Sequence, residues 1–289
     1  MNNKIKIITD TGCDIDEVWL KDNNIEVLKF GLNIDEEEYE GETGKELGIE
    51  EFYNRLVKGA MPKTNQINPY TAREHIEPFL KEGYDVFYIS FSSGLSGSYA
   101  SVKSAMEELK ETYNNRMYVV DSLCASLGQG LFVDYIVRYM NEGKSFDEMV
   151  EYAEGLKLNI THVFTVDDLH HLKRGGRVSG ASAMLGTLLG IKPVLHVDNN
   201  GKLIALEKVR GRLSSIKRLY RLFEEKKDIT DNDPIFISHG NCLDDVMKLK
   251  EMIHENHPNN KIYINYIGPI VGSHAGQGTI ALFFKGKER

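Results

Sequence analysis

Residues 85–113, DVFYISFSSGLSGSYASVKSAMEELKETY, contain the transition that decides how this chain folds. The apolar run 85–91 predicts a buried strand, and a helical spacing of apolar residues begins at about Tyr99. A strand that leads directly into a helix is the repeating unit of parallel α/β sheets. The loop from Ser92 to Ser98 holds four serines and two glycines, although one serine is enough to cap a helix. Its composition raises the question of a second role.

The same alternation runs through the first half of the chain. Strand-like runs also lie at 4–10 and 116–122, and segments with helical spacing separate them. Strands separated by helices of this length predict an N-terminal domain with a mainly parallel sheet and helices on both faces, an α/β/α arrangement. Residues 25–42 predict an extended pair of strands with an acidic end.

The second half is less regular, and we predict a second α/β domain there. Its predicted elements are a glycine-rich turn at 173–180, a small-residue helix at 181–190, a hairpin over 191–211, a basic helix at 212–227, a βαβ unit and a final strand at 279–286. The hairpin prediction depends on Asn199-Asn200-Gly201, a strong turn signal. We place the boundary between Leu156 and Asn159, which gives domains 1–157 and 158–289.

Composition excludes several classes of protein. The 289 residues are 41% hydrophobic and carry a net charge of −8, which argues against a nucleic-acid surface. No apolar run has the length of a membrane span, so at most transient membrane contact is expected. Cys13, Cys124 and Cys242 are odd in number and widely spaced, which favours a reducing cytoplasm over a disulfide framework or a zinc site. The first residues show no secretory segment and predict a strand.

Motifs of enzymes and nucleotide-binding proteins are absent from the sequence. It has no P-loop, no dinucleotide-binding glycine motif and no G-x-S-x-G elbow. Asp10 follows a strand but Gly12 stands where an aspartyl phosphatase needs its second acid, so we expect Asp10 to form local hydrogen bonds. His170 and His171 are adjacent and cannot share one helical face. We predict no metal site and no cofactor.

The serine-rich loop is suited to binding an anion. A helix N-terminus presents free N–H groups and partial positive charge, and serine hydroxyls with bare glycine backbone complete such a nest. The alternative is a cap with loop residues around it. Two other polar stretches are candidates for the same site: Thr64-Asn65-Gln66 before a helix, and His274 between Gly272 and Gly276.

The ordered set of motifs resembles the DegV family over essentially the whole chain. The motifs are the ITD first strand, TNQ, SSGLSGSY, LKRGGRVSG, LLGIKPVL, KVRGR and GPIVGSHAGQG. The resemblance implies a two-domain α/β protein that holds one long-chain fatty acid in a tunnel between its domains. It also implies a fatty-acid-binding subunit of a bacterial fatty acid kinase, whose separate catalytic subunit phosphorylates the carboxylate.

The resemblance also implies roles for individual residues. Thr64, Ser96 and His274 fall on the positions that contact the carboxylate or lie beside it. Asn65 replaces the family's usual serine and still supplies a hydrogen-bond donor. From the nest argument we expect Ser93 and Gly97 to take part in ligand binding. The small-residue run 181–191 is the predicted tunnel wall.

Two arginines are predicted to contact the kinase subunit. The resemblance points to Arg210 in the KVRG motif, and Gly175-Gly176 form a turn that projects Arg174 or Arg177, of which we take Arg177 as the contact. The alternative function is a hydrolase or transferase for a small anionic substrate, with Ser96 as nucleophile and His274 as acid or base. No third residue at a recognisable spacing orients His274, which is the sequence feature against that alternative.

Overall fold

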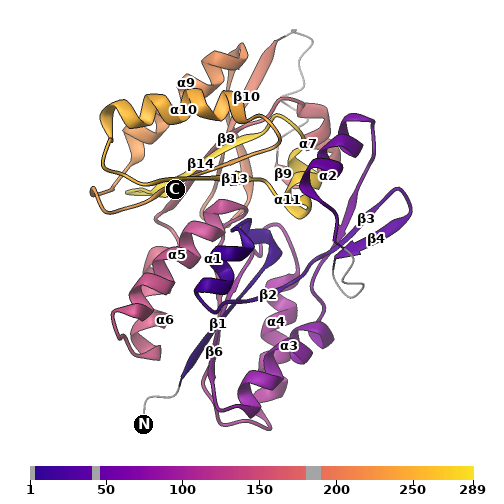
Figure 1. The fold of residues 1–289 in the computed structure, drawn as a ribbon, viewed down its shortest axis with the longest axis vertical. Coiled ribbons are helices and arrows are strands. Elements are labelled where there is room, and N and C mark those ends of the chain that lie inside the picture. Colours follow the sequence, from indigo (N-terminus) through magenta and orange to yellow (C-terminus); the bar gives the residue numbers. More distant parts are fainter. Residues whose placement is uncertain (1–3, 41–45, 180–189) are drawn as a thin grey trace.

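The computed structural model describes residues 4–40, 46–179 and 190–289. In Figure 1 most of the first half of the chain, in indigo to magenta, lies below the second half, in orange and yellow, whereas α2 (Ile49–Val57) lies beside the second half. The strands before α6 (Phe146–Leu156) and those from β8 (Ile160–Thr165) onward belong to different sheets. We propose the turn between α6 and β8 as the domain boundary, as the sequence predicts.

The first sheet has four parallel strands in the order β2-β1-β6-β7. Their bounds are Glu26–Leu28, Ile5–Asp10, Asp85–Ser90 and Met117–Asp121. Helices α1 (Glu17–Asp22), α5 (Leu127–Asn141) and α6 pack on one face of this sheet, and α3 (Pro69–Lys81) and α4 (Ser98–Lys110) pack on the other. Alternate residues of β6 face opposite ways: Phe87 and Ile89 pack with the first group of helices, whereas Val86 and Tyr88 pack with the second. The predicted parallel sheet with helices on both faces is confirmed.

The second sheet has seven strands in the order β13-β12-β14-β8-β10-β11-β9. Besides β8 they are β9 (Val178–Ser179), β10 (Ile191–Val197), β11 (Leu203–Arg210), β12 (Ile235–His239), β13 (Ile262–Tyr266) and β14 (Ile280–Lys285). Helices α9 (Arg212–Lys226) and α10 (Leu243–Asn256) cover one face of it (Figure 1). The opposite face is turned toward the first half, where Phe164 and Phe283 join the core formed by α5.

Two predictions for the second half are confirmed by the strand pairing. β10 and β11 form an antiparallel hairpin around Asn199-Asn200-Gly201, and Gly201 has φ of +70°, which glycine adopts without strain. β12, α10 and β13 form the predicted βαβ unit with parallel strands. The predicted small-residue helix at 181–190, which was also the predicted tunnel wall, falls almost entirely outside the described residues.

Residues 25–42 differ from the predicted pair of strands. β2 joins the parallel sheet, while β3 (Gly31–Ile34) and β4 (Glu37–Glu40) form a separate hairpin to which β5 (Lys63–Asn65) adds a third strand. The hairpin turn is formed by Asp35 and Glu36, with φ of +52° and +66°. Turns of this kind usually contain asparagine or glycine, so the acidic pair gives no turn signal in the sequence.

Asp10 is fully buried at the end of β1. Its carboxylate accepts hydrogen bonds from the backbone amides of Gly12 at 3.1 Å and Phe91 at 2.9 Å, and from Gln129 Nε2 at 3.1 Å. Burial raises the pKa of Asp10 to about 6. The bond from Gly12 confirms the expected local hydrogen bond, and the bond from Phe91 ties the end of β1 to the start of the serine-rich loop.

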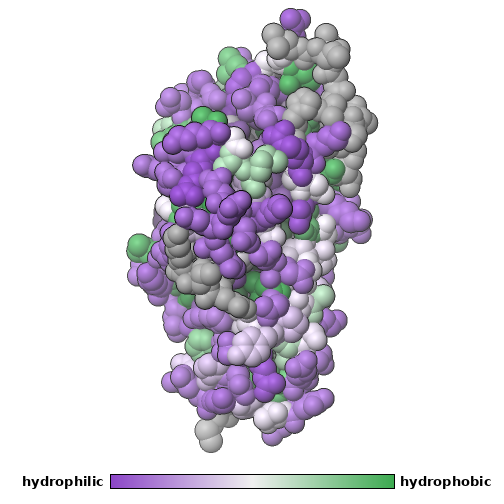
Figure 2. Space-filling view, turned by 90° about the vertical axis from the view of Figure 1, so that its right-hand side faces the viewer, coloured by the Kyte–Doolittle hydropathy of each residue, from purple (hydrophilic) through white to green (hydrophobic). Residues whose placement is uncertain are grey.

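One face of the molecule is mixed in polarity. Figure 2 shows a face on which hydrophilic side chains predominate and hydrophobic ones are scattered in small groups. Within the described residues, every helix is too short or too polar to cross a membrane.

Candidate ligand cavity

A cavity of about 490 Å³ lies between the second sheet and the loops that follow the strands of the first sheet. Residues on one face of β8 and β14 form part of its wall: His162 and Phe164 line it beside their pairing partners Phe283 and Ala281. Residues of opposite parity, such as Leu282, pack instead under α9 and α10. The alternation of side chains along two strands therefore builds an apolar wall.

The histidine in this wall is uncharged. His162 is 2% exposed, and burial lowers its pKa well below the usual range, so its ring is uncharged at neutral pH. The other apolar lining residues are Phe30, Phe91, Leu95, Ala125, Leu172, Val197, Leu203, Ile267, Ile270, Val271 and Ala275. This composition suits a hydrocarbon ligand.

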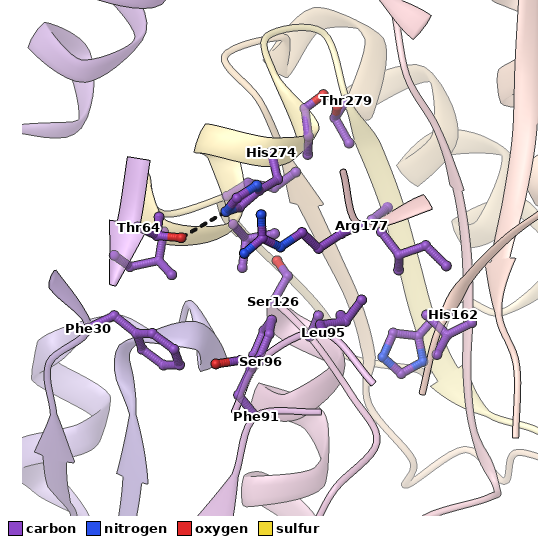
Figure 3. A pocket seen from close by; sticks show the side chains of 18 of the residues that line it. Phe30, Thr64, Phe91, Leu95, Ser96, Ser126, His162, Arg177, His274 and Thr279 are labelled. Atoms are coloured by element: carbon purple, nitrogen blue, oxygen red, sulfur yellow. Dashed lines mark hydrogen bonds between the residues drawn. The ribbon is translucent and has the colours of Figure 1, made fainter. Parts of the chain in front are cut away.

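Polar side chains gather at one side of the cavity (Figure 3). Thr64 Oγ1 lies 2.9 Å from His274 Nε2, and His274 Nδ1 lies 3.1 Å from the carbonyl oxygen of Gly175. Because a carbonyl can only accept, Nδ1 carries the proton, and Nε2 of the neutral ring accepts the Thr64 hydroxyl. Burial, and secondarily the charge of Arg177, lowers the pKa of His274 to about 4. His274 is therefore neutral at pH 7.

The serines of the serine-rich loop have different roles. Ser96 lines the cavity, and its Oγ accepts the amide of Ser98, the first residue of α4, at 3.2 Å. The N-cap residue of α4 is Gly97, so no side chain caps this helix. Ser98 is buried, and its Oγ accepts the amide of Ile67 at 3.1 Å. Ser92 donates to the Gly201 carbonyl at 2.8 Å and so joins the loop to the β10–β11 hairpin. A simple cap therefore does not explain the cluster.

Most of the predicted ligand-binding residues come together. Thr64, Asn65, Ser96, Gly97 and His274 all line the cavity, although they come from three distant parts of the chain. The exception is Ser93, which is not among the lining residues.

Ser93 lies apart from the cavity lining, contrary to expectation. Ser93 is exposed, and its backbone amide donates to Asp121 Oδ1 at 3.1 Å. The reason is the turn at the end of β6, which directs Ser92 inward to Gly201 and leaves the next residue outside.

The two arginines predicted to meet a partner lie in different places. Arg177 lines the cavity and has its guanidinium beside His274, where Nη1 donates to the Gly175 carbonyl at 2.9 Å (Figure 3). Arg210 is exposed at the end of β11, opposite Ile191. No sequence pattern indicated that Arg177 would face the ligand cavity.

Gln66 belongs to the candidate stretch Thr64-Asn65-Gln66, whereas sequence reasoning missed the polar lining residues Ser126, His162 and Thr279. Gln66 lines the cavity, and its Nε2 donates to Ser101 Oγ at 3.2 Å. Ser126 Oγ lies 2.5 Å from Asp14 Oδ2, and burial raises the pKa of that carboxyl to about 7. Ser126 has φ of +54°, a conformation that non-glycine residues rarely adopt, and no sequence motif indicates it.

The alternative function, a hydrolase or transferase, needs a hydrogen bond between Ser96 and His274. Both ring nitrogens of His274 are engaged, by Thr64 and by Gly175, while Ser96 Oγ lies 3.0 Å from Ser98 Oγ. A serine nucleophile needs a base within hydrogen-bonding distance, and among the described residues Ser96 is not bonded to His274. Nothing in the geometry favours that function.

Comparisons with known proteins agree in fold and in family. A family model described as "Uncharacterised protein, DegV family" matches residues 4–287. A DegV domain-containing protein of Clostridium perfringens is 43% identical over 284 residues, which cover 98% of each chain. A solved structure described as DegV, a fatty acid binding protein from Bacillus subtilis, is 30% identical with a TM-score of 0.85, over 99% of this chain and 100% of that one. A fatty-acid-binding DegV family protein from Thermus thermophilus is 27% identical with a TM-score of 0.87, over 98% and 99%.

Proposed function

This chain belongs to the DegV family, and from that premise we propose that it binds one long-chain fatty acid in the cavity between its two halves. The observation that carries the proposal is the composition of the cavity wall. Apolar side chains line most of its roughly 490 Å³, and hydroxyl, amide and guanidinium groups gather at one side. An amphipathic ligand with a long tail and a small anionic head matches this division.

Burial of the tail provides most of the binding free energy. About fifteen methylenes at roughly 0.8 kcal/mol each give about 12 kcal/mol before the cost of ordering the chain. A hydrogen bond to the charged head adds about 1.5–3 kcal/mol. The tail therefore sets the affinity, and the polar groups set the position of the carboxylate.

The head group is proposed to lie among Thr64, Ser96 and Arg177. A carboxylate there places negative charge beside His274, which raises the pKa of the imidazole and favours the protonated ring. A protonated ring donates from both nitrogens, so Nε2 then becomes a donor and the Thr64 hydroxyl is released toward the ligand.

Mass spectrometry of the purified protein tests the proposal directly. We expect denaturing extraction to recover a long-chain fatty acid at close to one molecule per chain. A protein purified without any fatty acid that also fails to take one up from solution would contradict the proposal, as would recovery of a nucleotide or a sugar phosphate.

Alanine substitutions distinguish the cavity-lining residues Thr64 and Ser96 from the exposed Ser93. We expect Thr64→Ala and Ser96→Ala each to weaken fatty-acid binding about tenfold, because each removes one hydrogen bond to a charged group and little core volume. Ser93→Ala is the matched control, since Ser93 is exposed, and its affinity should stay at the wild-type value. Titration of delipidated protein measures the affinity. Equal losses in all three variants would count against this position of the head group.

We propose further that the bound acid is presented to a separate kinase subunit in the cytoplasm, without catalysis by this chain alone. The proposal rests on the family resemblance and on exposed positive charge at Arg210, which can steer association with an acidic partner. Arg210→Glu should raise the concentration needed for half-maximal acyl-phosphate formation and leave the fatty acid bound. Arg73→Glu on α3, which is also exposed, is the control. Wild-type behaviour of Arg210→Glu would exclude this residue from the docking surface.

A further inference from the structure

A buried histidine lies in the cavity wall away from the proposed head-group site. His162 is on β8 opposite Phe283, and Figure 3 shows it on the other side of the cavity from Thr64. We propose that the cavity takes a long-chain fatty acid with a hydroxyl group along its chain, and that His162 Nε2 accepts a hydrogen bond from this hydroxyl. The inference rests on the proposed function, because it takes the carboxylate to lie at Thr64 and the tail to fill the rest of the cavity.

The ring of His162 has an acceptor that is not used within the protein. Nδ1 lies 3.0 Å from the carbonyl oxygen of Ile160, and because a carbonyl can only accept, Nδ1 carries the proton. Burial, and secondarily the charge of Arg289, lowers the pKa of His162 well below its usual range, so the ring is neutral and Nε2 has no proton. Nε2 therefore keeps a lone pair that can only accept a hydrogen bond.

This lone pair is buried and unpaired. His162 is 2% exposed, and within the described residues Nε2 has no hydrogen-bond partner. Burial of a polar atom without a partner is unfavourable, and most such atoms in proteins are paired. An alkyl chain without a polar group leaves Nε2 in this state, whereas a donor on the chain satisfies it.

Packing fixes the ring and keeps side chains away from Nε2. The ring of Phe283 lies edge-on to the imidazole, with 5.1 Å between the two ring centroids. A Cβ atom on Gly128, in the first turn of α5, would lie 2.0 Å from Nε2, so any other residue at 128 would put a carbon atom directly beside this nitrogen. Together with the bond from Nδ1 to Ile160, these contacts hold the acceptor in one orientation before a ligand binds.

The lining of the cavity restricts the donor to a neutral group. Among the described lining residues there is no aspartate or glutamate, so an ammonium group on the chain would be buried without a carboxylate beside it. A hydroxyl donates a hydrogen bond while it stays neutral, and its burial costs little once it is hydrogen-bonded. A hydroxylated acyl chain therefore matches an apolar wall that contains this acceptor.

Two other hydroxyl-bearing residues of the lining are less suited to this role. Ser126 Oγ lies 2.5 Å from Asp14 Oδ2, and Thr279 Oγ1 donates to the carbonyl of Ala275 at 2.9 Å. Both hydroxyls already have a partner, so neither is left unsatisfied by an unsubstituted chain. His162 Nε2 is the acceptor whose free energy changes most when a hydroxyl arrives.

Matched ligands and matched variants test the role of His162. Delipidated full-length protein is titrated with octadecanoic acid, with octadecanoic acids hydroxylated at successive mid-chain positions, and with the alpha-hydroxy acid, whose hydroxyl lies beside the carboxylate. The variant is His162→Phe, which removes the acceptor. His196→Phe on the neighbouring strand β10 is the control, because His196 is half-buried and also has an unpaired ring nitrogen but does not line the cavity.

We expect the wild type to bind at least one mid-chain hydroxy acid as tightly as octadecanoic acid, or more tightly. His162→Phe should lower the ratio of that affinity to the affinity for octadecanoic acid about tenfold or more, because the hydroxyl is then buried without a partner. His196→Phe should leave the ratio unchanged. The ratio for the alpha-hydroxy acid should stay at its wild-type value in both variants.

A second measurement needs no variant, so it also applies if His162→Phe misfolds. In nitrogen-labelled wild-type protein, the nuclear magnetic resonance signal of His162 Nε2 should shift when the mid-chain hydroxy acid replaces octadecanoic acid, because the lone pair becomes hydrogen-bonded. The alpha-hydroxy acid should leave the signal where octadecanoic acid places it.

Two results would overturn the role of His162. One is a wild type that binds every mid-chain hydroxy acid about tenfold or more weakly than octadecanoic acid. The other is an unchanged affinity ratio in His162→Phe together with an unchanged Nε2 signal. Failure of the wild type to bind octadecanoic acid and all of its hydroxy derivatives is a different result, because it contradicts the proposed function itself.

Discussion

Tryptophan in place of Ala281 is expected to abolish fatty-acid binding while the protein stays folded. Ala281 is 7% exposed, lies on β14 opposite Phe164, and faces the cavity. An indole there occupies space that the acyl tail needs. Exclusion of four methylenes, at roughly 0.8 kcal/mol each, costs about 3 kcal/mol and lowers affinity more than about 100-fold. The fold tolerates the ring because the cavity has room for it, whereas a close-packed core does not.

The experiment measures fatty acid per chain after extraction, together with affinity by titration and the thermal unfolding midpoint. Ala125→Phe fills the same cavity from the first half of the chain. It is a second variant that should abolish fatty-acid binding, and it replaces Ala281→Trp if that protein misfolds. Ala100→Trp on α4 is the control, since Ala100 is exposed. A folded Ala281→Trp protein that still carries one fatty acid per chain would contradict the proposed cavity.

The parallel sheet could be predicted because its strands are buried on both faces. Residues 85–90 are continuously buried, and such a run followed by a helix has few other structural solutions. The hairpin of β3 and β4 could not be predicted in the same way, since Asp35 and Glu36 form its turn without glycine or asparagine. A strand or turn can therefore be predicted from local sequence only when its own residues have the burial pattern or the turn residues typical of it.

The sequence could predict some of the residues that line the cavity, namely those in polar stretches next to helices. Thr64 and Ser96 each lie in a polar segment that precedes a predicted helix, and His274 lies in a glycine-rich stretch. Each could therefore be recognised from the sequence as a polar, accessible residue. Ser126 and Arg177 were not, because their place in the cavity depends on how the two halves meet. Ser93 shows the converse. As a serine of the serine-rich loop it matched the expected anion-binding nest, but the turn after β6 directs it outward.

The roles of the serines also depend on contacts between distant segments. Ser92 donates to Gly201, and a Cβ atom on Gly94 would lie 2.5 Å from the backbone oxygen of Asn200. The loop therefore packs directly against the turn of the β10–β11 hairpin. Glycine at 94 is required by this approach of two backbones, which no local pattern reveals.

Removal of the Arg289 guanidinium is expected to have the largest effect on stability. Arg289 is 6% exposed, and its guanidinium donates to the carbonyls of Ser122 and Leu123 in the first half, Lys157 after α6, and Asp198 in the second half. It thus joins segments on both sides of the proposed domain boundary. Arg289→Ala leaves several buried carbonyls without donors, and we expect a loss of about 3–5 kcal/mol in the free energy of unfolding.

Urea denaturation at neutral pH, monitored by far-ultraviolet circular dichroism and by tyrosine and tryptophan fluorescence, measures this loss. Arg289→Lys should recover only part of it, because one ammonium cannot serve carbonyls that diverge around a planar guanidinium. Lys287→Ala is the control, since Lys287 is exposed and two positions away. Transitions that separate between the two probes in Arg289→Ala would show that the halves unfold independently once this link is lost. A variant within about 1 kcal/mol of the wild type, with coincident transitions, would show instead that the apolar packing around α5 holds the halves together without Arg289.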